Sequence, residues 1–487
     1  MPFAQYNNTA AAFADDPVAT HPTISPQSER PTLVADPVAR ERADQAALLR
    51  VVIATITHFF GPLASFMTRV SDPRDPEKIT YSLPALLFTG LLLFLCRLGS
   101  RRQVTHLLRN GVSAANFHSL FGVEMCPHGD TLNEAFCRLS PDQMQAEVSS
   151  LAETLIRKKV LYPYRVLGRF YVVAIDGTQI YTFHTRHCPH CLTRTTRDGK
   201  TLYYHTVLEA KLVTPTGFSF SLMSEFIENP APNPTKQDCE LKAFYRLAHR
   251  LKARFPRLPI LLSMDGLFAG GPTFTLCQQY GWKFMIVLKD DDLPSVNQEF
   301  AALKALMPGD KLRFRTGQQL EITQLYQWVD SITYVDSDQQ QHALSVLECH
   351  ETKPSAEGRQ TTKFKWITNL AVAAKNVREL ASDGGRIRWK IENEGFNTQK
   401  NDGFALEHAY SQNETATKVF YFLLQIAHLL FQLIERGSLL KQVFEDGCGS
   451  AKNLAYRLLE AWRNCLIDTH VQDLLTHRRF QIRFDTS

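Results

Sequence analysis

Three acidic residues have the chemistry and the setting of metal ligands. Asp176 ends the apolar run 171–175, and Asp265 ends a second apolar run, 260–264. Glu392 lies in a later segment with a helical pattern. The local context of each residue suits a metal-binding carboxylate. Two buried strands that each deliver an Asp, together with a helix that delivers a Glu, can build a two-metal site for phosphoryl transfer.

The residues around Glu392 include a guanidinium and an aromatic ring. Arg388 precedes Glu392 by four residues, so the two side chains share one face of a helix. The guanidinium could clamp a phosphate through two hydrogen bonds, or it could form an ordinary surface ion pair. Trp389 follows Arg388 directly and is expected to be a core aromatic residue. Glu394 is a rival carboxylate, but it projects away from the face of Arg388, which favours Glu392.

A cluster of histidines and cysteines follows Asp176. Cys188 and Cys191 have the spacing of half a zinc site, and His184 or His187 could complete it. The alternative is an ordinary loop in a reducing compartment. If zinc binds, we expect it to have a structural role beside Asp176 and to take no part in catalysis.

Basic residues alternate with apolar ones in two segments before Glu392. Period-two alternation puts the cations of each strand on one face of a sheet. That face is either solvated or lies against DNA phosphates. The basic residues are Lys311, Arg313 and Arg315 in the first segment, and Lys363 and Lys365 in the second.

The elements that position these residues predict an α/β fold. The chain reads as helical up to about residue 165, and its pattern changes to strands at Phe170. The element order that follows is that of a ribonuclease-H-like mixed sheet, with a β-rich insertion before Glu392. The expected elements are strands at 170–175, 203–213 and 218–223, a helix at 236–255, a strand ending at Asp265, a helix at 272–280 and a strand at 283–288.

These patterns divide the chain into five regions. We expect a flexible tail at 1–45, because this segment offers little apolar surface to offset the entropy of ordering. The other regions are a helical N-terminal region at 46–165, a ribonuclease-H-like core at 166–289 and 368–445, a β-rich insertion at 290–367, and a C-terminal helical tail at 446–487.

The charge, cysteine content and apolar segments of the chain say more about its cellular compartment than about its function. The chain has 487 residues and a formal charge of +5, which permits a nucleic-acid partner without arguing for one. Ten cysteines without a secretory signal pattern favour a reduced cytosolic compartment. The apolar segment 83–95 would reach about 20 Å as a helix, short of the roughly 30 Å of a bilayer core. A buried helix is therefore expected there, and no membrane partner.

The chain resembles the DDE transposases of bacterial insertion sequences, in the cut-and-paste branch with a Tyr-Arg-Glu-Lys signature and a β-rich insertion. The resemblance covers roughly residues 165 to 435, and the Arg-Trp-x-Ile-Glu element is its most specific part. The motifs that carry it are Ala174-Ile175-Asp176-Gly177-Thr178, Met264-Asp265-Gly266-Leu267-Phe268 and Arg388-Trp389-Lys390-Ile391-Glu392-Asn393.

The resemblance implies an activity and its partners. Asp176, Asp265 and Glu392 would hold two Mg²⁺ ions, for which Mn²⁺ can substitute. The reaction would be cleavage at the ends of a mobile element and strand transfer into target DNA, with 46–165 as the DNA-binding region and the ribonuclease-H-like core as the catalytic one. Aromatic residues near the site of this family can stack on a flipped base during end processing, which is the other role open to Trp389. The implied partners are double-stranded DNA, as terminal inverted repeats and as target, and a second copy of the chain in a homodimeric end complex.

The chain departs from this signature at two positions. Gly385 stands where the family has its Tyr, and Gln399 stands where it has its Lys. Lys400 is one residue further on, so it could bind phosphate only if the helix bends or ends beforehand. Two alternatives therefore stay open: a metal-dependent nuclease of the same fold that does not join strands, and a DNA-binding transposase relic whose site has decayed.

Overall fold

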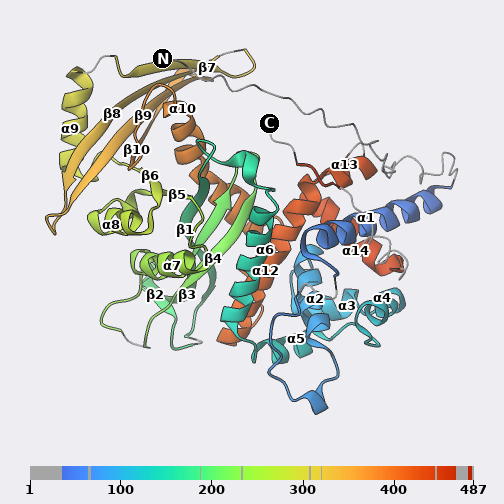
Figure 1. The fold of residues 1–487 in the computed structure, drawn as a ribbon. Coiled ribbons are helices and arrows are strands. Elements are labelled where there is room, and N and C mark those ends of the chain that lie inside the picture. The colour runs from blue at the N-terminus through green and yellow to red at the C-terminus, as the bar shows by residue number, and fades with distance from the viewer. Residues whose placement is uncertain are drawn as a thin grey trace, which may run out of the picture.

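The fold is a mixed α/β structure with one large sheet and helices before and after it (Figure 1). The computed structural model describes residues 36–63, 67–186, 188–231, 234–306, 309–319, 321–444, 447–467 and 481–484.

The N-terminal region is helical, as expected, but its first helix begins earlier than the sequence indicated. Helix α1 starts at Pro37, inside the segment predicted as a flexible tail. The Asp36 carboxylate accepts a hydrogen bond from the Val38 amide, and Pro37 occupies the first helical position, which together favour a helix start there. The helices are α1 (Pro37–Phe60), α2 (Leu83–Leu95), α3 (Arg101–Leu107), α4 (Gly111–Phe121), α5 (Gly129–Phe136) and α6 (Pro141–Arg157).

The most apolar helices are parts of the core. Nearly all of α2 is buried, which confirms the expectation for 83–95. Helix α12 (Glu414–Arg436) is long and apolar enough to cross a membrane, but 94% of its apolar window is buried inside the protein. Helix α1 passes the same test of length and composition with 50% of its window buried. Core helices commonly pass such a test, so it is weak evidence for a membrane span.

The centre of the sheet follows the predicted element order. Strands β1, β3 and β4 are antiparallel neighbours, while β5 is parallel to β1 and β6 is parallel to β5. The short strand β2 pairs with the N-terminal end of β3, at residues 201–204. The bounds are β1 (Tyr171–Phe183), β2 (Leu192–Thr195), β3 (Thr201–Val213), β4 (Ser219–Ile227), α7 (Glu240–Arg254), β5 (Ile260–Met264), α8 (Gly271–Tyr280) and β6 (Lys283–Val287).

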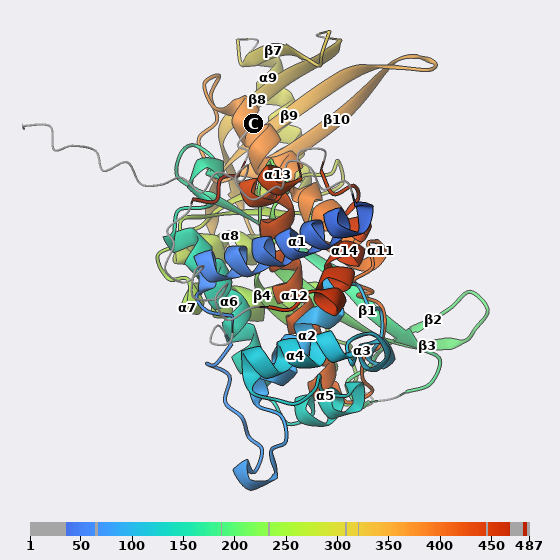
Figure 2. The ribbon, with the colours of Figure 1, turned by 90° about the vertical axis from the view of Figure 1, so that its right-hand side faces the viewer.

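The β-rich insertion is continuous with this sheet. Its last strand, β10, pairs antiparallel with β6, so the sheet contains ten strands. The insertion extends from the body of the molecule and carries helix α9 along one face (Figures 1 and 2). The bounds are α9 (Pro294–Leu306), β7 (Lys311–Thr316), β8 (Ile322–Val335), β9 (Gln341–Ser355) and β10 (Gly358–Thr368).

The two faces of the central sheet are covered by different elements. Val173 and Ile175 of β1 belong to the core that includes α6, α7 and α12, whereas Val172 and Ala174 face a second core. The second core includes residues of a broken helix between residues 377 and 401. Its segments are α10 (Val377–Glu379), the π-helical η5 (Leu380–Gly385), the 3₁₀ turn η6 (Arg386–Arg388), the π-helical η7 (Ile391–Asn397) and α11 (Thr398–Asn401); α13 (Ser438–Val443) and α14 (Ala451–Asn464) follow α12.

Candidate functional site

Asp176 and Asp265 occupy equivalent positions at neighbouring strands, Asp176 within β1 and Asp265 directly after β5. Ala174 of β1 pairs with Ser263 of β5 in a parallel register, and each Asp comes two residues later. Because side chains alternate along a strand, the two carboxylates leave the sheet on the same face. Strand β1 does not end at Asp176, as the sequence suggested, but continues to Phe183 because residues 176–183 pair with β3.

Glu392 belongs to the broken helix that covers this face. It lies in η7, which packs against β1. The pKa of Asp176 is raised above its ordinary value, first by burial, while Arg388 lowers it and the charges of Asp265 and Glu392 raise it further. Asp265 and Glu392 are therefore close enough to Asp176 to repel its negative charge.

A fourth carboxylate lies beside these residues and was missed in the sequence. Glu240 opens helix α7, and burial raises its pKa, with further contributions from Asp176 and Asp265. Gly177 makes room for it, because a Cβ at that position would collide with the Glu240 carboxylate. An acidic residue in the first turn of a helix is an ordinary capping pattern, so the sequence carried no distinct signal for Glu240.

Arg388 pairs with Asp176, not with Glu392. Its Nη1 donates a hydrogen bond to Oδ2 of Asp176 over 2.9 Å, and its side chain is 15% exposed. The helix that carries Arg388 and Glu392 is not a regular α-helix, because it contains a 3₁₀ turn and a π-helical segment. The Arg388 Nε atom is buried and has no hydrogen-bond partner in the described part of the chain.

Trp389 is a surface residue. Its side chain is 57% exposed, so it is not the core aromatic residue that one interpretation offered. The guanidinium carbon of Arg388 lies 5.4 Å from the centre of its ring. Glu394, the rival carboxylate, instead pairs with Lys390 over 2.7 Å and approaches Arg436 at 3.9 Å.

Gln399 and Lys400, at and just after the position where the resembling transposases have a lysine, both have partners within the protein. Gln399 is completely buried, and its Nε2 lies 2.9 Å from both Gln425 Oε1 and His428 Nδ1. Lys400 pairs with Glu407 over 3.4 Å. Lys400 is therefore held by a carboxylate of its own segment, and Gln399 is part of a buried polar network.

No family model matches the chain, and neither does any curated protein sequence.

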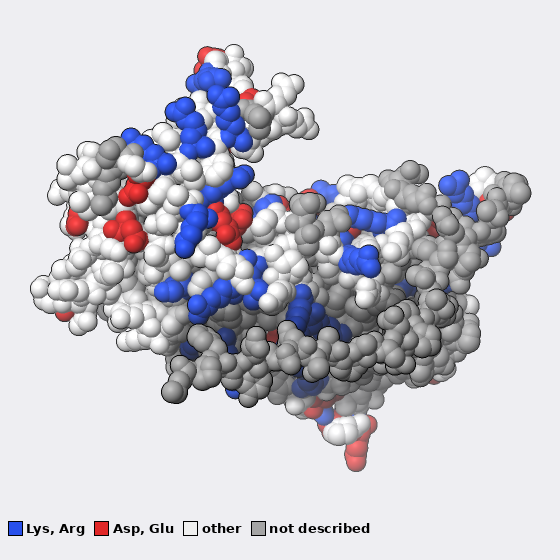
Figure 3. All heavy atoms as spheres, turned by 45° about the horizontal axis from the view of Figure 1, so that its top comes forward, with Lys and Arg blue, Asp and Glu red and all other residues white. Residues whose placement is uncertain are grey.

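The two basic segments of the insertion differ in exposure. Lys311, Arg313 and Arg315 are exposed on β7, which is an edge strand of the sheet. Figure 3 shows that Lys and Arg side chains gather on this protruding part of the molecule. Lys363 and Lys365 of β10 both pair with Asp290, and Lys365 is only 8% exposed. The expectation of a free basic face on β10 is therefore wrong for Lys365.

A second group of ligands lies beyond the end of β1. Sγ of Cys188, Sγ of Cys191 and Nε2 of His205 all lie within 4.8 Å of one another and could bind a metal such as zinc. His205, on β3, was not foreseen, because only the fold brings it to the cysteine pair. His184 is exposed and does not belong to this group, and His187 lies outside the described residues.

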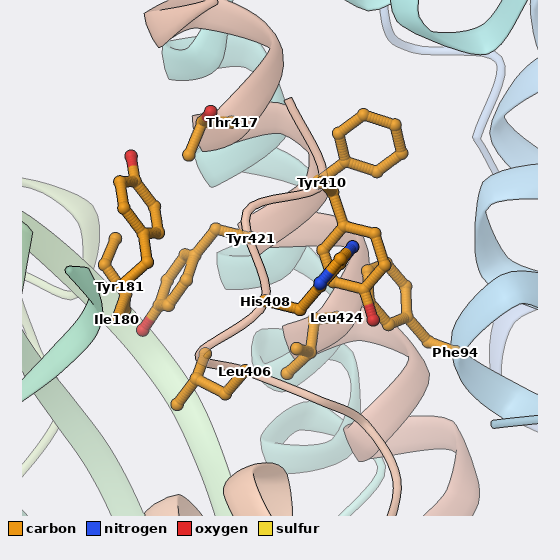
Figure 4. A pocket seen from close by; sticks show the side chains of 10 residues that line it. Phe94, Ile180, Tyr181, Leu406, His408, Tyr410, Thr417, Tyr421 and Leu424 are labelled. Carbon is orange, nitrogen blue, oxygen red and sulfur yellow. The ribbon is translucent and has the colours of Figure 1, made fainter. Parts of the chain in front are cut away.

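A small cavity between β1, α12 and the segment around His408 has no apparent role. It has a volume of about 20 Å³, about enough for one water molecule, and Figure 4 shows the aromatic side chains around it. Burial and Arg101 lower the pKa of His408 on its wall.

Proposed function

We propose that the chain is a transposase that cleaves the ends of a mobile DNA element and transfers them to target DNA. One observation carries the proposal. Asp176 in β1 and Asp265 directly after β5 lie at equivalent positions of two neighbouring parallel strands, and the charges of Asp265 and Glu392 both raise the pKa of Asp176. Three carboxylates from two strands and a later helix are what a two-metal phosphoryl-transfer site needs.

The strand arrangement supports the proposal. Strands β4, β3 and β1 are antiparallel neighbours, and β5 and β6 follow on the other side of β1 in parallel orientation. Together with the element order, this arrangement favours a ribonuclease-H-like core. The insertion before Glu392 also agrees with the resembling family.

The donor set fits Mg²⁺, because every candidate ligand is a carboxylate oxygen. Asp176, Asp265 and Glu392 would hold the ions, and Glu240 stands beside them. These carboxylates do not form a group of three ligand atoms within 4.8 Å. In a two-metal site the ions stand about 3.5–4 Å apart, so the ligands are spread over two coordination spheres. Bound Mg²⁺ would activate the attacking oxygen and stabilise the leaving one.

The basic and aromatic residues would position the DNA. Arg388 is anchored by Asp176 through Nη1 and would place its positive charge beside a phosphate of the DNA. Trp389 offers an exposed ring to an unstacked base. Lys311, Arg313 and Arg315 on the edge strand would contact duplex phosphates without reading sequence.

The test uses the full chain with labelled duplexes made from the DNA that brackets its reading frame. In Mg²⁺ or Mn²⁺ we expect cleavage at inverted repeats and, with added target DNA, a joined product. Cleavage without joining would overturn the transposase in favour of a nuclease of the same fold. Binding without cleavage in either metal would favour a decayed relic.

A further inference from the structure

We propose that Cys188, Cys191 and His205 bind a zinc ion that fastens a basic hairpin to the central sheet. The inference does not depend on phosphoryl transfer, because none of the three residues belongs to the carboxylate site.

The three ligand atoms are already close to the spacing of a zinc site. The two sulfur atoms lie 3.3 Å apart, and Nε2 of His205 lies 3.3 Å from Sγ of Cys188 and 3.4 Å from Sγ of Cys191. Tetrahedral zinc with Zn–S bonds of about 2.3 Å and Zn–N bonds of about 2.0 Å separates such atoms by about 3.5–3.8 Å. Movements of a few tenths of an ångström would therefore admit the ion.

The surroundings hold two of the ligands in place. Cys191 and His205 are buried, and the Cys191 carbonyl accepts a hydrogen bond from Nδ2 of Asn229 over 2.8 Å. The His205 ring lies 5.0 Å from the ring of Tyr181, its partner in β1. The register between β1 and β3 shifts just before Tyr181, and such a bulge re-aims the side chains beside it.

The donor types select zinc over the hard cations of the carboxylate site. Two thiolates and an imidazole are soft and borderline ligands, which Mg²⁺ and Ca²⁺ do not favour. The sulfur separation of 3.3 Å is well beyond the about 2.05 Å of a disulfide bond. The fourth position falls to a water molecule, because His190 is directed to the Asn229 carbonyl at 2.7 Å.

Zinc at this point would cross-link the two ends of a projecting hairpin. The cysteines precede β2 and His205 lies in β3, so the ion joins the segment before the hairpin to its returning strand. Figure 2 shows β2 and β3 extending away from the body of the molecule. The hairpin and the segment before it expose cations, and the guanidinium carbon of Arg194 lies 5.3 Å from the Tyr204 ring. The exposed cations are Arg186, Arg194, Arg197 and Lys200, with Asp198 as the exposed acid among them.

The first experiment measures metal content in the full wild-type chain, purified without chelators or metal-affinity resin. We expect elemental mass spectrometry to find about one zinc ion per chain. After zinc is removed, Co²⁺ should give the visible absorption of a tetrahedral thiolate site. A chain that holds no zinc and takes up neither zinc nor cobalt would overturn the proposal, and so would a Cys188–Cys191 disulfide in protein kept under reducing conditions.

Variants assign the ligands and the structural role. Cys188→Ser, Cys191→Ser and His205→Ala should each lower zinc content at least tenfold, whereas Cys239→Ser and His118→Ala, at exposed residues outside the group, should not. Removal of zinc from the wild-type chain should speed hydrogen exchange in β2 and the first half of β3 while leaving β5 unchanged. Zinc that persists in all three ligand variants, or exchange that does not respond to zinc, would contradict the proposal.

Discussion

Arg388 reaches across from the broken helix to Asp176, with Nη1 and Oδ2 2.9 Å apart. The two residues are 212 positions apart in the chain, so the pair ties the last part of the proposed site to its first strand. It also sets the electrostatics of the site. Burial raises the pKa of Asp176, and Arg388 is the largest influence that opposes the rise.

This pair predicts a change in pH dependence. Asp176 must be ionised to bind a metal ion, so activity should fall as the pH drops through its folded pKa. Arg388→Ala removes the charge that lowers this pKa, and the acidic limb of the cleavage profile should move to higher pH. The comparison is Arg386→Ala, whose guanidinium pairs with Glu351 instead. An unmoved acidic limb in Arg388→Ala would contradict the role of the pair.

The ionised carboxylate of Glu240 should lower the free energy of unfolding when no metal is bound. Its pKa is raised in the folded state, so the cost is absent below the unfolded pKa and appears as the pH rises through the folded one. Glu240→Gln should therefore raise Tm at neutral pH without divalent cations, by about 1–3 °C. The gain should shrink as the pH is lowered.

Glu394→Gln is the matched control for Glu240→Gln, because Glu394 has cationic partners in Lys390 and Arg436. It should not raise Tm at any pH. A gain for Glu240→Gln that is the same at acidic and neutral pH would show that the buried charge of Glu240, with the repulsion from Asp176 and Asp265, is not its cause.

A lysine at position 399, where the transposases that the chain resembles have one, should destabilise this chain. Nζ of Lys211 already donates to Oε1 of Gln425 over 2.6 Å, and Gln399 shares that acceptor. Gln399→Lys would bury a second ammonium group there, at a cost of about 3 kcal/mol or more in the free energy of unfolding. Urea unfolding measures the cost. Gln399→Glu, which supplies a carboxylate near Lys211, should be milder, and a Gln399→Lys chain of wild-type stability would refute the argument.

Trp389 should matter for DNA and little for folding. A substitution at a surface position changes stability by about 0.5 kcal/mol or less, whereas loss of a base-stacking ring costs about 1–3 kcal/mol. Trp389→Ala should keep its Tm and slow end processing by roughly five- to a hundredfold. Tyr456→Ala is the control, because Tyr456 is 61% exposed on α14. Equal effects of the two changes on cleavage would remove Trp389 from the site.

Local patterns in the sequence were enough to predict the centre of the fold. Apolar runs and turn residues mark β1, β3, β4, β5 and β6, and the same runs place Asp176 and Asp265 beside one another. The length of β1 was underestimated because residues 177–183 lack a clear apolar alternation, and their pairing with β3 depends on the whole sheet.

Contacts between distant segments were not predictable in this way. Glu240 and His205 join their groups only because a helix start and a neighbouring strand pack beside the first strand. The pairing of β10 with β6 and the burial of Lys365 likewise depend on contacts between segments that are distant in the sequence. The π-helical segments and the pairing of Arg388 with Asp176 also carry no simple sequence signal.

The most direct test of the proposed site is Asp176→Asn in a cleavage assay with labelled element ends and Mg²⁺. Asp338→Asn, at an exposed carboxylate between β8 and β9, serves as the control. We predict that Asp176→Asn binds the DNA with wild-type affinity but loses cleavage by at least about a hundredfold, while Asp338→Asn cleaves normally. Cleavage at the wild-type rate by Asp176→Asn would contradict the account.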